Sequence, residues 1–203
     1  EAVYVTLADE IRGFSDQSGL RATYGSLAPL YIHINVLVQT VHDVFKPHDW
    51  HLPGEYFSSL RLLSVAFGIG TALTIAWIGW QLTGPAAALI GGLIWSLAPI
   101  VVDLNSLAIP DPLLYLICAL AVATAIAAWQ RRSMRWLALS LLCGIAAIYL
   151  KLWVFTAVLP FVIVSLALLH RDRRAFLPRI ALLYAAAGVS ALYFIVALNP
   201  LAN

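Results

Sequence analysis

Charged residues are scarce in this sequence. Asp, Glu, Lys and Arg make up 11% of its 203 residues, whereas 62% are hydrophobic and the mean hydropathy is +0.89. A soluble domain carries about 25% charged residues and roughly 45–50% apolar ones. A soluble globule of this size could not cover so much apolar surface, so lipid must be the solvent for much of the chain. The sequence predicts an integral membrane protein.

An excess of basic charge and a set of cysteines are also missing. Twelve Lys and Arg against ten Asp and Glu leave no basic face, so nucleic acid is excluded as a partner. The two cysteines, Cys118 and Cys143, both lie within apolar runs. They are typical of small core residues rather than of a disulfide or a metal site. The sequence also has no nucleophile-elbow serine and no glycine-rich phosphate loop.

Long apolar runs are what the sequence does contain. A membrane-spanning helix needs about 20 mostly apolar residues, and about six segments approach that length. We therefore expect an all-α fold, a polytopic transmembrane helix bundle over residues 58–203, preceded by an exterior loop region over residues 1–57. The segments are Leu60–Leu82, Pro85–Val102, Pro112–Trp129, Trp136–Leu150, Leu152–Leu169 and Ile180–Leu198.

Lys151 separates the fourth and fifth of these segments. Joined together, the two would form one rod of roughly 34 residues and roughly 50 Å, far longer than the hydrocarbon thickness of about 30 Å. One overlong helix and a helical hairpin are the two alternatives, and the length favours the hairpin.

The positively charged residues are concentrated in two short links. Seven of the twelve lie between the third and fourth segments or between the fifth and sixth. The positive-inside rule places both links in the cytoplasm. Alternation of the spans then puts residues 1–57, Asp111 and Lys151 on the exterior side. The seven are Arg131, Arg132, Arg135, Arg171, Arg173, Arg174 and Arg179.

Residues 1–57 form a different kind of sequence, with several acids, histidines and turn residues. Their apolar stretch, Leu27–Phe45, is interrupted by polar residues, which favours a helix lying in the membrane interface over a spanning one. A polar exterior region with no span before it also leads us to expect a further helix upstream. The histidines His42, His48 and His51 match no strong zinc-ligand spacing, so no metal site is predicted.

Several ionisable side chains map to the predicted exterior face. Such residues at a membrane edge are costly unless they pair or face an aqueous cavity. Carboxylates there can act as a general base or hold a divalent cation, and cations can bind a phosphate. Each also has a structural alternative: a helix N-cap for Asp111, anchors at the headgroups for Arg61 and Lys151, and a solvated surface pair for the other two. The candidates are Asp9, Glu10, Arg61, Asp111 and Lys151.

The order of several short elements resembles the GT-C glycosyltransferases, in particular the branch with protein O-mannosyltransferases and lipid A aminoarabinose transferases. Members usually begin with a span before the acidic loop and continue with further spans, so the resemblance is to a partial or shortened member. The elements are Ala8-Asp9-Glu10-Ile11-Arg12, Ala28-Pro29-Leu30-Tyr31, the run Ser59–Ser64 around Arg61, Gly84–Leu89, Pro110-Asp111 and Gly144–Lys151.

The resemblance implies an inverting hexosyl or pentosyl transferase that uses a polyprenyl-phosphate sugar donor at the exterior membrane face. It implies Asp9 as the general base toward an acceptor hydroxyl, with Glu10 supporting it. Asp111 would orient a substrate or help to bind a cation, while Lys151 and Arg61 would stabilise the departing lipid phosphate.

Other properties follow from the same resemblance or stay open. The acceptor is a lipid, a glycan or a protein, and no cofactor is certain, with a divalent cation as the open alternative. The implied location is a bacterial or archaeal plasma membrane, with Asp9, Asp111 and Lys151 on the non-cytoplasmic side. A second hypothesis is a non-catalytic membrane subunit on a shortened glycosyltransferase scaffold, with membrane-protein partners on its Gly- and Ala-rich helix faces. A transporter is disfavoured because no predicted span has an acid or base at its centre.

Overall fold

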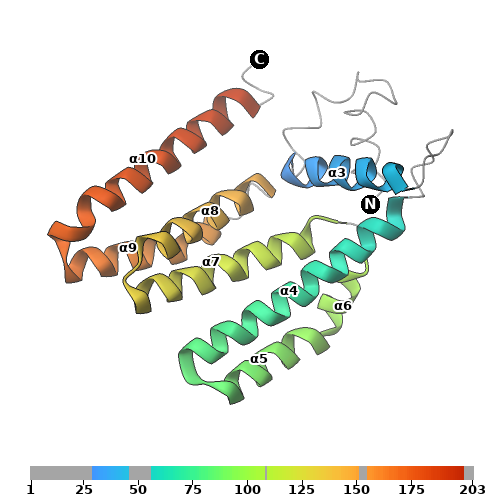
Figure 1. The fold of residues 1–203 in the computed structure, drawn as a ribbon, viewed down its shortest axis with the longest axis horizontal. Coiled ribbons are helices and arrows are strands. Elements are labelled where there is room, and N and C mark those ends of the chain that lie inside the picture. The colour runs from blue at the N-terminus through green and yellow to red at the C-terminus, as the bar shows by residue number, and fades with distance from the viewer. Residues whose placement is uncertain (1–28, 46–55, 108, 151–154, 199–203) are drawn as a thin grey trace.

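The described part of the chain is helical throughout. The computed structural model describes residues 29–45, 56–107, 109–150 and 155–198, and these ranges contain no strand (Figure 1). The expected all-α membrane helix bundle is confirmed. Its helices are α3 (Pro29–Phe45), α4 (Phe57–Thr83), α5 (Pro85–Leu97), α6 (Pro99–Asn105), α7 (Asp111–Arg131), α8 (Met134–Leu150), the 3₁₀ turn η3 (Phe155–Val158), α9 (Leu159–Arg171) and α10 (Arg173–Leu198).

The helices from α4 onward lie side by side and alternate in direction (Figure 1). Two of them, α4 and α7, are each long and apolar enough to cross a membrane, and α5 with α6 meets that test as a bent pair. Two others, α8 and α9, are shorter apolar helices. These findings cover only the described residues, and the total of about six spans stays a prediction.

The second predicted span, Pro85–Val102, forms two helices, α5 and α6, which together still meet the length and composition test for a span. It breaks at Ala98, and the two helices on either side of the break meet at a bend of 64°. Pro99 explains the break, because proline has no N–H to donate and its ring disfavours helical geometry in the residue before it. Ala98 accordingly has an extended conformation, with φ −66° and ψ 119°.

The short turns at the other end of the bundle follow from local sequence. Gly84 ends α4 with φ 104°, a conformation that L side chains rarely adopt, and Pro85 opens α5 at its first turn. The α7–α8 turn passes through Arg132 in the left-handed region, where Ser133 N–H donates to the Ala128 carbonyl at 3.2 Å. Sharp turns of this kind keep successive helices antiparallel and adjacent.

The predicted hairpin between α8 and α9 is confirmed. Leu137 and Leu141, in the first half of α8, pack in one buried cluster with Leu168, near the end of α9. At the opposite end of α8, a Cβ atom on Gly144 would lie 3.2 Å from the Ala157 carbonyl oxygen. The chain therefore folds back along α8 after Leu150. Lys151 lies outside the described residues.

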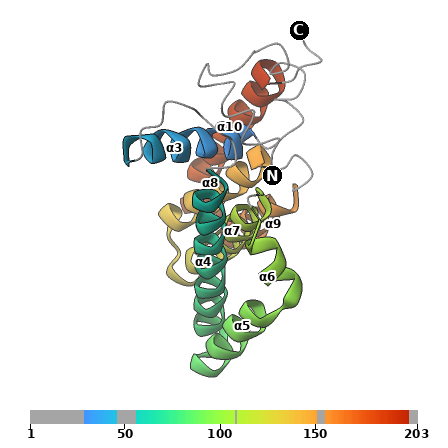
Figure 2. The ribbon, with the colours of Figure 1, turned by 90° about the vertical axis from the view of Figure 1, so that its right-hand side faces the viewer.

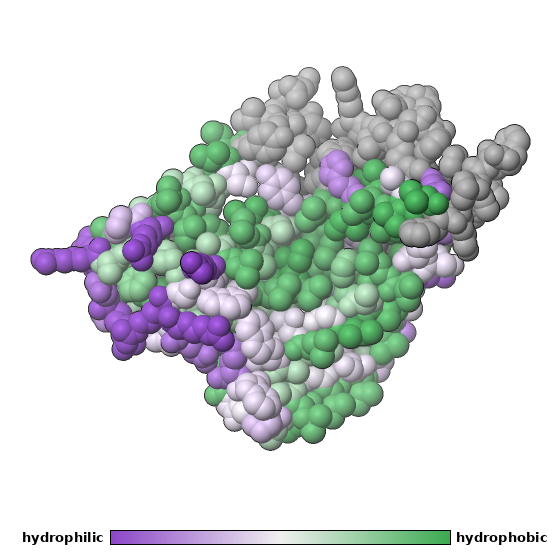
Figure 3. Space-filling view, in the orientation of Figure 1, coloured by the Kyte–Doolittle hydropathy of each residue, from purple (hydrophilic) through white to green (hydrophobic). Residues whose placement is uncertain are grey.

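The two arginine links lie at one end of the bundle. All seven arginine side chains in these links are exposed, and hydrophilic residues gather at the left end of the molecule in Figure 3, where α7 meets α8 and α9 meets α10. At the second link Asp172 Oδ1 accepts a hydrogen bond of 3.1 Å from Ala175 N–H, so this aspartate caps α10. Both arginine links thus lie at the same end of the bundle, as the predicted alternation of helices requires.

Helix α3 lies across the opposite end of the bundle, transverse to α4 (Figure 2). It turns Tyr31, Asn35 and Gln39 inward, where they are buried, while large apolar side chains such as Leu37 and Val44 are exposed. This outward apolar face is compatible with the interfacial helix expected from Leu27–Phe45, whose position in a membrane stays a prediction.

Candidate functional site

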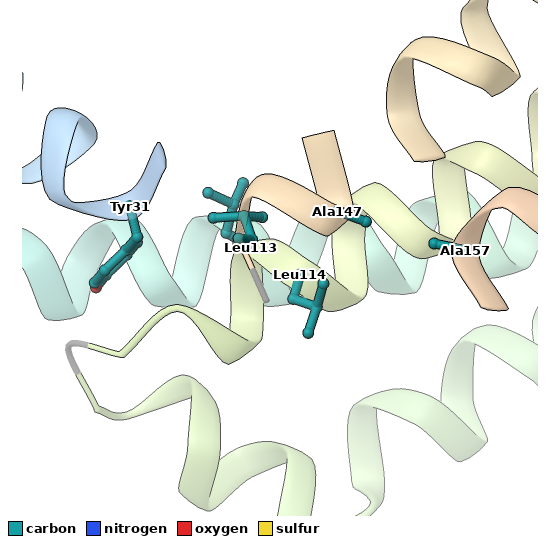
Figure 4. Packing of buried hydrophobic residues seen from close by; sticks show 6 residues of the cluster. Tyr31, Leu113, Leu114, Ala147 and Ala157 are labelled. Carbon is teal, nitrogen blue, oxygen red and sulfur yellow. The ribbon is translucent and has the colours of Figure 1, made fainter. Parts of the chain in front are cut away.

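The end of the bundle under α3 brings together the helix termini on which the candidate residues lie. A buried cluster joins Tyr31 of α3, Leu113 and Leu114 of α7, Ala147 and Leu150 of α8, and Ala157 of η3 (Figure 4). Tyr31 belongs to the Ala28-Pro29-Leu30-Tyr31 element and is 1% exposed. This packing holds the start of α7 and the end of α8 against the same helix, α3.

Asp111 is the first residue of α7 and is half-buried. The N-cap position of α7 is occupied by Pro110, which makes no side-chain cap hydrogen bond, and Asp111 lies in the first turn. A carboxylate in the first turn interacts favourably with the positive end of the helix dipole. Pro112 at the next position helps to start the helix, because its missing N–H would have had no helical partner there.

The register between α7 and α8 places Asp111 level with the end of α8. Ser140 Oγ of α8 donates a buried hydrogen bond of 2.8 Å to the Ala121 carbonyl of α7. Asp111 lies ten residues before Ala121, and Leu150 lies ten residues after Ser140. In antiparallel helices these two residues reach the same height, about 15 Å from that hydrogen bond. Lys151 directly follows Leu150 in the sequence.

Arg61 is the fifth residue of α4, at the same end of the bundle, and is exposed. Its guanidinium carbon is 6.0 Å from the centre of the Phe57 ring. Helices α4 and α7 run in the same direction, and Gly70 of α4 faces Leu116 of α7. That register puts Asp111 level with Val65, so Arg61 is about one helical turn farther out than Asp111.

The second half of α3 is held to the start of α4 by polar contacts. Tyr56 O–H donates to Asp43 Oδ1 at 2.9 Å, and His42 Nδ1 lies 3.1 Å from Ser59 Oγ. The His42 and Tyr56 rings also meet edge to face, with centroids 5.3 Å apart. His42 therefore has a structural role, and no group of three metal-ligating side chains occurs among the residues that the structure describes. His48 and His51 are not among those residues.

Two of the five candidate residues can be placed. The structure brings Asp111 and Arg61 to one end of the bundle, opposite the arginine links. Asp9, Glu10 and Lys151 lie outside the described residues. Their roles stay predictions.

Sequence reasoning missed two polar atoms in the bent segment. Asn105 Oδ1 and Trp95 Nε1 are both buried, and neither has a hydrogen-bond partner in the described part of the chain. The sequence signal was the Pro99 that splits the apolar run, because a helix broken inside a membrane leaves polar groups that lose their regular helical surroundings.

The comparisons with known proteins point to one family. A family model described as dolichyl-phosphate-mannose-protein mannosyltransferase matches residues 50–198. The match covers more than half of the chain and includes Arg61, Asp111 and Lys151, while Asp9 and Glu10 precede it. No curated protein and no solved structure matches the chain. The chain belongs to the dolichyl-phosphate-mannose-protein mannosyltransferase family, a family of membrane glycosyltransferases of the GT-C type.

Proposed function

We propose that this protein transfers a sugar from a polyprenyl-phosphate donor to an acceptor hydroxyl at the exterior membrane face, with inversion at the anomeric carbon. The observation that carries the proposal is the position of Asp111. This carboxylate lies level with Leu150, the residue before Lys151, at the bundle end opposite the arginine links. The description of the family names a lipid-linked mannose, dolichyl-phosphate-mannose.

The transfer is a single displacement. The acceptor oxygen attacks the anomeric carbon while the bond from that carbon to the donor phosphate breaks, and the polyprenyl phosphate leaves with the electron pair. Asp9 takes the acceptor proton, because an alcohol is a weak nucleophile until a positioned base removes its proton. Glu10 supports Asp9. No covalent enzyme intermediate is needed, which agrees with the lack of a serine nucleophile motif in the sequence.

Negative charge develops on the bridging phosphate oxygen as the donor bond breaks. Lys151 and Arg61 are the cations that we assign to that charge. Asp111 orients the sugar or the acceptor beside them, and it contributes a ligand where a divalent cation takes part. The acceptor is a lipid, a glycan or a protein, and the protein works in a bacterial or archaeal plasma membrane.

The test is transfer activity of the full chain in liposomes, with a radiolabelled polyprenyl-phosphate mannose and a short hydroxyl-bearing acceptor. We expect Asp9→Asn to lower the rate about 10²–10⁴-fold through loss of the base. Lys151→Gln should lower it about 10²–10³-fold through loss of charge stabilisation. Asp111→Asn should cost about 10²-fold through misplacement of the substrate.

Asp103→Asn is the matched control. This carboxylate is exposed on α6, near the same end of the bundle, and has no role in the proposed reaction. We expect its rate to stay within about twofold of the unchanged chain. Full activity in Asp9→Asn, or retention of anomeric configuration in the product by NMR, would overturn the mechanism. Absence of transfer by the unchanged chain with every donor tested would favour a non-catalytic subunit.

A further inference from the structure

Three arginines lie close together in the sequence where α7 turns into α8, and no carboxylate accompanies them. Arg131, Arg132 and Arg135 are all exposed, and none of them has an ion pair within the residues that the structure describes. The sequence contains no Asp or Glu between Asp111 and Asp172. The turn therefore presents positive charge that is open to an anion from outside the chain.

Arg131 is held in place by aromatic side chains. Its guanidinium carbon is 5.3 Å from the centre of the Trp136 ring, and Trp136 in turn meets Trp77 of α4 with ring centroids 6.0 Å apart. Next to Arg131, Gln130 Nε2 donates a hydrogen bond of 2.9 Å to the Gln81 carbonyl and so joins the end of α7 to the end of α4. A guanidinium fixed in this way loses less conformational entropy when it binds a ligand.

The kind of cation narrows the choice of anion. Both basic links contain arginine and no lysine. Membrane topology requires only positive charge, for which lysine serves as well as arginine. A guanidinium differs from an ammonium in its planar set of donors, which can bind two oxygens of one phosphate or carboxylate at once. The use of arginine therefore favours an oxyanion as the ligand.

The exposed face of α8 indicates what is attached to that oxyanion. Leu139 and Leu142 follow Arg135 at spacings of four and three residues, so the three side chains lie on one face of the helix. The two leucines are 42% and 61% exposed. A cation at the helix start with apolar side chains along the same face matches a lipid, whose phosphate lies at the membrane surface and whose acyl chains lie in the hydrocarbon. A free phosphate or a soluble acidic protein would leave the leucines uncovered.

The link between α9 and α10 has more arginines but lacks these features. Asp172 stands between Arg171 and Arg173 in the sequence and supplies a negative charge of its own. Its Oδ1 already accepts the Ala175 N–H at the start of α10, at 3.1 Å. Among the described residues, no arginine of this link lies over an aromatic ring. This link therefore provides a comparison of similar charge without a fixed guanidinium.

We propose that the turn between α7 and α8 binds the phosphate of an anionic glycerophospholipid. Arg131 and Arg135 donate hydrogen bonds to the phosphate oxygens, with Trp136 as the platform for Arg131, and Arg132 adds positive charge beside them. One acyl chain lies along Leu139 and Leu142. The site is at the end of the bundle opposite Asp111 and does not depend on sugar transfer (Figure 1).

Mass spectrometry of the intact chain in detergent tests the proposal, because it counts bound lipid molecules. The probe is phosphatidylglycerol, and the control is phosphatidylcholine with the same acyl chains, whose choline cation cancels the phosphate charge. We expect one phosphatidylglycerol to bind about tenfold more tightly than phosphatidylcholine. Equal binding of the two lipids would overturn the proposal, and this comparison needs no variant to fold.

Substitutions separate a defined site from diffuse attraction to positive charge. Arg131→Gln and Arg135→Gln should each weaken phosphatidylglycerol binding about three- to tenfold. Arg173→Gln removes the same charge from the other link and should change binding less than about twofold. An equal loss in all three variants would show a diffuse effect and would contradict the site.

Two further measurements test the platform and the acyl chain. Trp136→Phe keeps an aromatic ring under Arg131 and should bind nearly as the unaltered chain does, whereas Trp136→Leu should lose about as much affinity as Arg131→Gln. Glycerol phosphate, which has no acyl chains, should not displace phosphatidylglycerol. Displacement by glycerol phosphate or by a polyglutamate peptide as effective as displacement by lipid would overturn the assignment of a lipid.

Discussion

Replacing Gly144 by alanine should weaken the packing of α8 against η3. A Cβ atom at this position would lie 3.2 Å from the Ala157 carbonyl oxygen, 3.2 Å from Val158 Cγ2 and 3.3 Å from Val158 Cα. Two of these three atoms belong to the backbone, which cannot move aside by changing a rotamer. The two segments must therefore separate by a few tenths of an ångström, at an overpacking cost of about 1–3 kcal/mol.

The net effect also includes helix propensity. Alanine is more favourable than glycine inside a helix by about 1 kcal/mol, so Gly144→Ala should change stability by between about 0 and −2 kcal/mol. Gly188→Ala is the matched control, because an added Cβ meets nothing within 4 Å there. That variant should gain about 1 kcal/mol. The difference between the two variants isolates the packing cost.

Thermal unfolding of the detergent-solubilised protein measures this difference. At about 2–4 °C per kcal/mol for a domain of this size, Gly144→Ala should melt roughly 2–12 °C below Gly188→Ala. Gly144→Leu should melt lower still and should also reduce transfer activity, because Lys151 follows the end of α8. Equal melting temperatures for the two alanine variants would refute the packing of η3 on α8.

Two further predictions concern the register between α7 and α8. Ser140→Ala removes the 2.8 Å hydrogen bond to the Ala121 carbonyl and should lower the free energy of unfolding in a membrane by about 1 kcal/mol. Ser165→Ala is the control and should lower it less, because the Ser165 hydroxyl bonds within its own helix. Equal losses of stability in the two variants would contradict the contact between α7 and α8. Cys118 and Cys143 are each three residues from that hydrogen bond, on facing helices, so a short thiol cross-linker should join them within one chain. Failure to cross-link them in the folded, membrane-embedded protein would refute the register that places Asp111 level with the end of α8.

The hydrophobic runs and arginine links were sufficient to predict the class of fold and its alternating helices. A run of apolar residues needs lipid wherever it packs, and a cluster of arginines is costly anywhere but at a membrane surface, so both signals are local. The hairpin at Lys151 followed from length alone, since one rod of that length does not fit the bilayer. Family membership also agreed with short motifs whose order is written in the chain.

Pro99 is visible in the sequence and causes the break at Ala98, but the sequence does not show what form the break takes. A proline in an apolar run is compatible with a kinked span, a broken span or a turn, and the neighbouring helices decide which of these forms. The same applies to α3, whose Asn35 and Gln39 were interpreted only as interruptions. Packing against the bundle made them the buried face and left Leu37 and Val44 outside.

The sequence by itself determined that this is a membrane helix bundle and which ends of its helices share a side. Only the tertiary structure decided which side chains meet at that end. Asp111 comes level with Leu150 in the register that the Ser140 hydrogen bond marks between two helices, and Asn105 packs against α4 because a distant glycine, Gly68, leaves room for its amide. Such contacts join residues far apart in the chain, so no local pattern encodes them.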